Sequence, residues 1–250
     1  MESAKDPQQS PDRDQAGNGH LAEINRGMAK GAAWMVAMRF SMRGIGLVST
    51  VILARLLVPA DFGLVAMATI IFGLIEVMSQ FGFGVFLIQK QNAGHDYYDT
   101  AWTLSILRGA VTCGLLFVIA MPVADFFGDP RLVEIFYVLA LVALVRSIGN
   151  VGVIDFQKNL TFGKDFKLHV AVKLAAFCVT ITAAILLRNY WALVIGIATA
   201  GFVRVALSYM MHPYRPRLSL ARWREIMHFS KWLLANNVLG FLNRQSDGLI

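Results

Sequence analysis

Long apolar runs alternate with short polar connectors along the chain after residue 30. Each run has about 22–27 residues. At a rise of about 1.5 Å per residue, a helix of this length crosses a hydrocarbon core of about 30 Å. Sustained alternation with period two is absent, so the pattern favours membrane-spanning α-helices over a β-barrel. The complete runs are Gly31–Leu57, Phe62–Ile88, Ala101–Val123, Arg131–Ile154, Phe166–Leu187 and Tyr190–Met211.

The runs predict an all-α, polytopic membrane protein with three parts. Residues 1–22 are polar and rich in Asp, Gln, Pro and Gly, which is typical of a disordered tail. Residues 23–211 hold the six apolar runs and predict a six-helix transmembrane lobe. Residues 212–250 begin with a basic linker, and a seventh apolar stretch starts near Trp223 and stops at Ile250 in the middle of its pattern.

Composition supports a bilayer-embedded chain. The hydrophobic fraction is 56% and the charged fraction is 16%, against about 45–50% and about 25% in ordinary globular proteins. Cys113 and Cys178 lie within apolar runs and predict neither a disulfide framework nor a metal site. We expect no metal and no cofactor.

The net charge of +7 would suggest nucleic acid in a soluble protein, but its distribution indicates membrane topology instead. Alternate connectors (Gln89–Thr100, Asp155–Asp165 and His212–Arg222) collect basic residues, whereas Arg131 and Arg188 lie at the edges of the others. Under the positive-inside rule the basic connectors are cytoplasmic. The sequence therefore predicts a cytoplasmic N-terminus in the cytoplasmic (inner) membrane and no nucleic-acid partner.

Ionisable residues within the predicted spans are the informative feature, because each costs about 2.5–3.5 kcal/mol at mid-bilayer on insertion scales. Most lie about 10–12 Å inside the cytoplasmic boundary, given the helical rise. Arg43 lies one turn deeper in the membrane than Arg39. Glu76 falls at a depth similar to that of Arg43, so we expect Glu76 to pair with Arg43. The set is Arg39, Arg43, Glu76, Arg108, Arg146, Lys173 and Arg204.

Two interpretations of this cationic layer stay open. The long side chains can snorkel toward the headgroups, or they can line a water-filled, inward-open cavity that attracts an anionic headgroup such as a diphosphate. Acidic residues that could relay a cation are scarce. Glu76 and Asp247 are the two candidates, either as charge partners of the basic residues or as groups that couple transport to an ion. This scarcity argues against a cation-driven drug exporter. Phosphate-cradling, Gly-x-Ser-x-Gly and His-Glu-x-x-His motifs are absent, so we expect no enzyme.

Three segments carry a family resemblance. Residues 52–68 (ILARLLVPADFGLVAMA) closely resemble the signature that joins the first two helices of bacterial polysaccharide flippases. These are the Wzx-like oligosaccharide-lipid translocases of the multidrug/oligosaccharidyl-lipid/polysaccharide exporter superfamily. Residues 156–162 (FQKNLTF) resemble the family connector after the fourth helix, with Lys158 where Arg is frequent. Residues 232–247 (WLLANNVLGFLNRQSD) resemble the start of the seventh helix, including Asp247, with Ser246 where Leu is usual.

The resemblance implies about 12–14 helices in two six-helix lobes around a central cavity, of which this sequence holds one lobe and the start of the next. The implied function is translocation of polyprenyl-diphosphate-linked oligosaccharide for O-antigen, capsule or exopolysaccharide synthesis. The implied partners are that substrate, membrane lipids, and a polysaccharide polymerase or glycosyltransferases. We expect the chain alone to be inactive or to depend on a second copy. The alternatives are a lipid II or multidrug exporter of the same superfamily, and a membrane subunit or enzyme of the polysaccharide assembly machinery.

Overall fold

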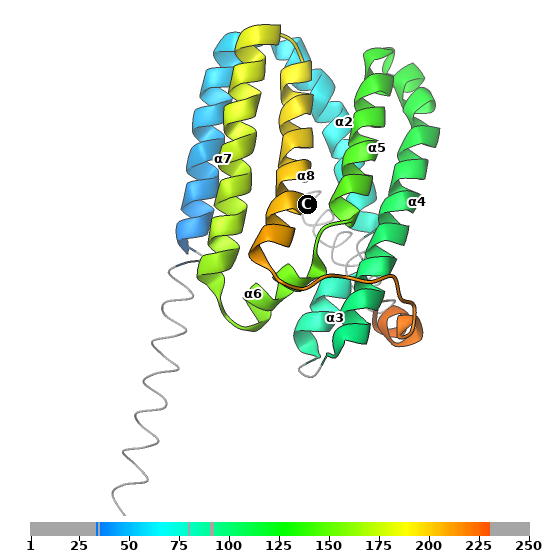
Figure 1. Cartoon of the computed structure of the whole chain (residues 1–250). Coiled ribbons are helices and arrows are strands. Elements are labelled where there is room, and N and C mark those ends of the chain that lie inside the picture. Colours follow the sequence, from blue (N-terminus) through cyan, green and yellow to red (C-terminus); the bar gives the residue numbers. More distant parts are fainter. Residues whose placement is uncertain (1–33, 35, 80, 91–92, 231–250) are drawn as a thin grey trace, which may run out of the picture.

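The apolar runs fold into a bundle of long antiparallel helices (Figure 1). The computed structural model describes residues 34, 36–79, 81–90 and 93–230. Within these residues the regular structure is entirely helical. The helices are a first helix, Val36–Leu56, then α2 (Pro59–Met78), α3 (Phe83–Gln89), α4 (His95–Phe127), α5 (Arg131–Ser147), the short η1 (Val151–Ile154) and α6 (Asp155–Lys158), α7 (Phe162–Leu187) and α8 (Trp191–Met211).

Five of these helices are long and apolar enough to cross a membrane, and the number rises to six if α5 and the bent segment after it count as one span. The expectation of an all-α polytopic membrane protein is confirmed. The basic connectors that the sequence placed on one side do lie at one end of the bundle, together with α3 and α6 (Figure 1). We call this the connector end, and the end with the turn at Gly128 the opposite end.

Two of the predicted spans are interrupted near the connector end. The sequence predicted one helix over 62–88, but α2 ends at Met78, and Gly82 adopts a left-handed conformation (φ 66°) before α3 begins. Glycine takes this conformation without a steric penalty. The predicted run Arg131–Ile154 is also divided, because the chain bends by 73° after Ser147. There the side chain of Asn150 accepts a hydrogen bond from the amide of Gly152 and starts η1.

The α4 helix is longer than its apolar run. It has 33 residues, which corresponds to about 50 Å at the ordinary helical rise. Because the apolar run begins at Ala101, the first turns of α4, which carry Asp96 and Asp99, project beyond the hydrocarbon layer at the connector end. Those turns are therefore available to bind polar segments at the membrane boundary.

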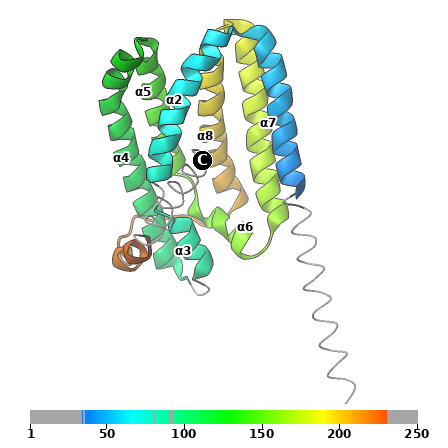
Figure 2. The ribbon, with the colours of Figure 1, turned by 180° about the vertical axis from the view of Figure 1, so that it is seen from behind.

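Close helix contacts occur where small residues face one another. Gly109 of α4 packs against Ser147 of α5, and Gly196 of α8 packs against Thr180 of α7. A Cβ at either glycine would overlap the facing side chain, and small residues of this kind let membrane helices approach closely. Figure 2 shows that α4 and α5 form one side of the bundle and the first helix and α7 the other, with α2 and α8 between them.

Candidate anion-binding cavity

A cavity of about 530 Å³ lies among the first helix, α2, α5, α7 and α8. Its walls are mostly apolar, but three of the cations predicted from the sequence reach it, namely Arg146, Lys173 and Arg204. They come from three different helices. The bundle thus gathers positive charge at one place inside the membrane-spanning region.

Helical periodicity explains how these side chains share the cavity. Lys173 lies one turn after His169 on α7, and both line the wall. Arg204 continues a row with Gly196 and Ala200 on α8, because residues four apart lie on the same helix face. Gly196 in that row lets α8 pack closely against Thr180 of α7, and both residues line the wall.

Arg146 is held from several sides. Its Nη1 atom lies 3.7 Å from Oε2 of Glu76 on α2, and its guanidinium carbon lies 6.0 Å from the ring centroid of Phe72. A Cβ at Gly201 would lie 3.6 Å from Cγ of Arg146 and 3.2 Å from Val142, so this glycine brings α8 against the arginine. The Nε atom of Arg146 is buried and has no hydrogen-bond partner in the described part of the chain. This unpaired donor therefore lies at the contact between α5 and α8.

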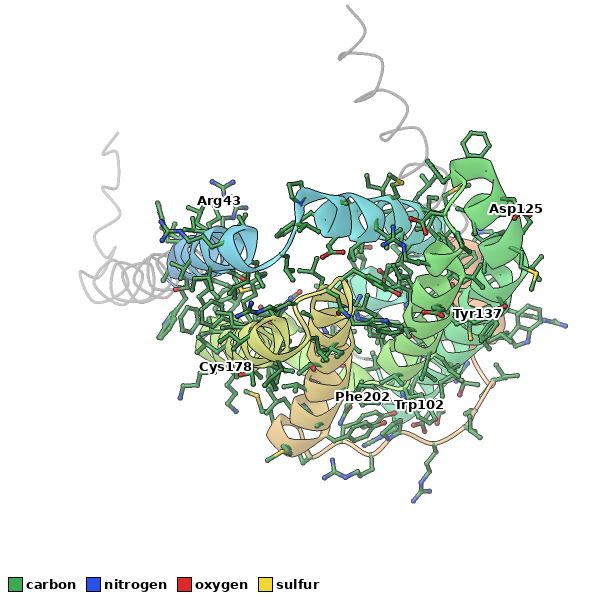
Figure 3. All side chains as sticks on the ribbon, turned by 90° about the horizontal axis from the view of Figure 1, so that it is seen from above. Arg43, Trp102, Asp125, Tyr137, Cys178 and Phe202 are labelled. Carbon is green, nitrogen blue, oxygen red and sulfur yellow. The ribbon has the colours of Figure 1, made fainter. Side chains whose placement is uncertain are left out.

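The other predicted cations lie elsewhere. Arg39 and Arg43 are exposed on the first helix, and Figure 3 shows Arg43 directed away from the bundle. Arg108 is half-buried on α4, and it is not among the residues that line the cavity. The structure pairs Glu76 with Arg146 and not, as expected, with Arg43. Asp247 lies outside the described residues.

Sequence reasoning missed His169. Its Nδ1 atom lies 2.9 Å from the backbone oxygen of Asp165 and 3.4 Å from that residue's Oδ1 atom. The signal was its position four residues before Lys173, on the same face of a helix. The cavity therefore combines three basic side chains with a histidine whose ring nitrogen lies within hydrogen-bond distance of a backbone oxygen.

This arrangement suits an anion that can accept hydrogen bonds from several donors at once. Guanidinium groups and ammonium groups both bind phosphate, the former in a bidentate manner and the latter as point charges. Within the residues that the structure describes, no group of three or more His, Cys, Asp or Glu could hold a metal ion. The basic side chains that reach the cavity are thus Arg146, Lys173 and Arg204.

A bundle with five to six helices of membrane-spanning length and apolarity defines a multi-pass membrane protein. The chain belongs to the polysaccharide biosynthesis protein family, whose model matches residues 52–250. No solved structure matches it significantly.

Curated relatives agree with this family. The chain is 28% identical over 228 residues to the lipopolysaccharide biosynthesis protein WzxC of Escherichia coli, covering 88% of this chain and 46% of WzxC. It is 23% identical to the succinoglycan biosynthesis transport protein ExoT of Rhizobium meliloti, covering 89% of this chain and 46% of ExoT. It is 24% identical to a membrane protein in the cps region of Klebsiella pneumoniae, covering 86% and 45%. The chain thus spans about half the length of these relatives.

Proposed function

We propose that the chain forms a lobe of a flippase that moves polyprenyl-diphosphate-linked oligosaccharide across the cytoplasmic membrane for polysaccharide biosynthesis. The observation that carries this proposal is the convergence of Arg146, Lys173 and Arg204 on one intramembrane cavity. The names of the relatives, which include a biosynthesis transport protein, support the same function.

The diphosphate is the part of such a substrate that the cavity fits. Its negative charge requires compensation inside the membrane, and the three basic side chains supply it. The polyprenyl tail stays in lipid, so the protein has to cover only the polar headgroup. The function needs no bond to be made or broken, and we accordingly propose a transporter and not an enzyme.

The distribution of basic residues supports the proposed orientation. Connectors with Lys90, Lys158 and Lys164 meet at the connector end, and so does the segment with Arg215 and Arg217. By the positive-inside rule this end is cytoplasmic. The oligosaccharide would therefore be loaded from the connector end. The proposed partners are the glycosyltransferases that build it on this side of the membrane and a polysaccharide polymerase on the other side.

Binding of farnesyl diphosphate, a short polyprenyl diphosphate, tests the proposal with the chain in phosphatidylcholine nanodiscs. We expect Arg146→Gln, Lys173→Gln and Arg204→Gln each to weaken binding about tenfold to a hundredfold, because hydrogen bonds to charged groups contribute about 1.5–3 kcal/mol. Arg43→Gln and Arg108→Gln are matched controls, since both cations lie outside the cavity wall, and farnesol is the uncharged control ligand.

Two results would overturn the proposal. One is equal binding of farnesol and farnesyl diphosphate, and the other is an equal loss of affinity in the control variants. Translocation needs both lobes, so it is tested in vesicles that contain a two-lobed flippase carrying this lobe, by the appearance of a fluorescent polyprenyl-diphosphate sugar in the outer leaflet, with Arg146→Gln as the inactive comparison.

A further inference from the structure

The segment between α8 and the next helix, residues 212–222, runs across the connector end and is fastened to α4. The amide of Arg217 donates to Oδ1 of Asp99 at 2.8 Å, and the amide of Ser219 donates to Oγ1 of Thr103 at 3.0 Å. The hydroxyl of Tyr214 also donates to Asp99. The connector segment is therefore held against α4 by hydrogen bonds, and part of it faces outward.

Residues 217–224, which end the connector segment and begin the next helix (residues 223–230), expose large apolar side chains. Leu218 is 75% exposed, Leu220 is 53% exposed and Trp223 is 46% exposed. By contrast, Tyr214 and Ile226, on either side of this stretch, are buried in a cluster with Phe83 and Leu87. The segment thus packs its flanks against the bundle and leaves three large apolar side chains uncovered by the described residues.

Exposed arginines are interspersed with these apolar side chains. Arg217, Arg222 and Arg224 are all exposed. Arg222 forms an ion pair with Glu225 at 3.2 Å, whereas Arg217 and Arg224 have no acidic partner within ion-pair distance in the described residues. The guanidinium of Arg224 lies over the ring of Trp223, 5.7 Å from its centroid. The face therefore presents an excess of positive charge beside apolar side chains.

The height of the segment along the bundle matches the membrane boundary. It contacts α4 at Asp99, Thr100 and Thr103, next to the start of the apolar run at Ala101. Trp102 and Tyr209 both donate hydrogen bonds to the backbone oxygen of Ile148 at this level, as expected of an interfacial aromatic belt. Figure 1 shows the segment crossing the connector end perpendicular to the long helices.

We propose that residues 217–224 form a lipid-binding surface, on which Leu218, Leu220 and Trp223 enter the membrane interface and Arg217 and Arg224 bind anionic lipid headgroups. Apolar side chains gain free energy when they leave water, and basic residues near an anionic leaflet add about 1 kcal/mol each. Charge complementarity selects this occupant, because a basic face beside the hydrocarbon boundary meets headgroup phosphates there. This surface is separate from the intramembrane cavity, so the proposal does not depend on the proposed function.

A nitroxide spin label at position 218 shows whether lipid, water or protein surrounds residues 217–224. Leu218→Cys is labelled in a Cys113→Ser, Cys178→Ser background and reconstituted in nanodiscs of phosphatidylcholine and phosphatidylglycerol. Val118→Cys on the exposed face of α4 serves as the lipid reference, and Asn159→Cys serves as the water reference. We expect relaxation by oxygen to exceed relaxation by a water-soluble nickel complex, as at position 118.

Greater relaxation by nickel, as at position 159, would show that the face is solvated and would overturn the proposal. Low relaxation by both reagents would show that protein covers the face, either residues 231–250 or another chain, and would overturn it equally. Each outcome is read from a labelled protein whose fold is checked by circular dichroism, so misfolding cannot mimic the expected result.

The charge part of the proposal is tested by native mass spectrometry of the lipids that the protein retains. Arg217→Gln and Arg224→Gln should each lower the enrichment of phosphatidylglycerol over phosphatidylcholine by up to about fivefold. Arg55→Gln, an exposed arginine at the opposite end of the bundle, is the matched control and should leave the ratio unchanged. Equal enrichment in all three variants would contradict the assignment of headgroup binding to this surface.

Discussion

The Nη1 atom of Arg146 lies 3.7 Å from the Oε2 atom of Glu76, so an ion pair joins α5 to α2 beside the cavity. Both side chains are about one-third exposed (31% and 32%), and pairs of this kind contribute at most about 1 kcal/mol. An anion that enters the cavity therefore competes with Glu76 for Arg146, and the carboxylate weakens anion binding by a modest amount.

Glu76→Gln should consequently strengthen the binding of pyrophosphate by up to about fivefold, because the competing charge is removed while the size of the side chain is kept. Isothermal titration of the reconstituted chain measures the effect. Glu134→Gln is the control, since Glu134 contacts Tyr190 at the opposite end of the bundle. Unchanged or weaker binding in Glu76→Gln would show that Glu76 does not compete with the anion.

Replacement of Gly196 by Ala should destabilise the bundle by about 1–3 kcal/mol, the usual cost of overpacking. Its Cβ would overlap Oγ1 of Thr180 on α7. Gly114→Ala on α4 is the matched control, because a Cβ there meets nothing within 4 Å and Ala favours the helix by about 0.5–1 kcal/mol. Thermal unfolding in detergent should therefore give a lower Tm for the first variant and an equal or higher Tm for the second.

Glu225 holds the first turn of the helix over residues 223–230, which follows the connector segment. Its Oε2 atom accepts hydrogen bonds from Tyr97 at 2.8 Å and from Lys90 at 3.1 Å. These contacts hold the pKa of the carboxyl below its ordinary value, with the Tyr97 hydrogen bond as the largest cause. Glu225→Gln should increase hydrogen–deuterium exchange over residues 223–230, and Tyr97→Phe should give a smaller increase. Unchanged exchange in both variants would show that apolar packing alone holds this helix.

His212 makes the docking of the connector segment sensitive to pH. Its Nδ1 atom accepts a hydrogen bond from the amide of Tyr214 at 3.2 Å, which requires that nitrogen to be unprotonated. Burial lowers the pKa of His212; Asp155 opposes the shift, whereas Lys164 and Arg215 add to it. The folded state therefore binds a proton at His212 less readily than the unfolded state does. The stability that neutral His212 contributes is complete above its unfolded-state pKa of about 6.5, and it declines as the pH falls through the lower folded-state pKa.

Exchange protection of residues 212–222 should therefore decrease between about pH 7.5 and about pH 5.5 beyond the change caused by intrinsic exchange chemistry. His212→Gln should remove this extra dependence. His228→Gln, at an exposed histidine, should retain it. If the two variants behaved alike, the pH dependence would have to come from another group.

The cations of the cavity could be predicted from the sequence because a charge in an apolar run is conspicuous. Lys173 and Arg204 stood out in this way, and the helical rise placed them at similar depth. The depth of a residue in the membrane does not show, however, toward which side of its helix the side chain points. The expected pair of Glu76 with Arg43 rested on depth alone, and Arg43 points away from the bundle (Figure 3). Which cations share a cavity depends on helix packing, which the runs do not encode.

The breaks in the predicted spans were hidden for a similar reason. Gly82 lies in an apolar run that contains other glycines, and hydropathy does not distinguish a left-handed glycine from one within a helix. Gly201 likewise reveals its role only through contact with Arg146 on another helix. The membrane class and the length of most spans follow from composition and periodicity, whereas the interior geometry follows from contacts between helices.

The hydrogen bonds from residues 217 and 219 to α4 also have a mechanical consequence. After α8 the chain is first held by Asn150, which donates to the backbone oxygen of Tyr214, and then by the first turns of α4, while Glu225 binds Tyr97 of α4 and Lys90 at the end of α3. A force applied to the residues that follow Ser230 would therefore pull first on α4 and its partner α3, and α8 would be shielded from it.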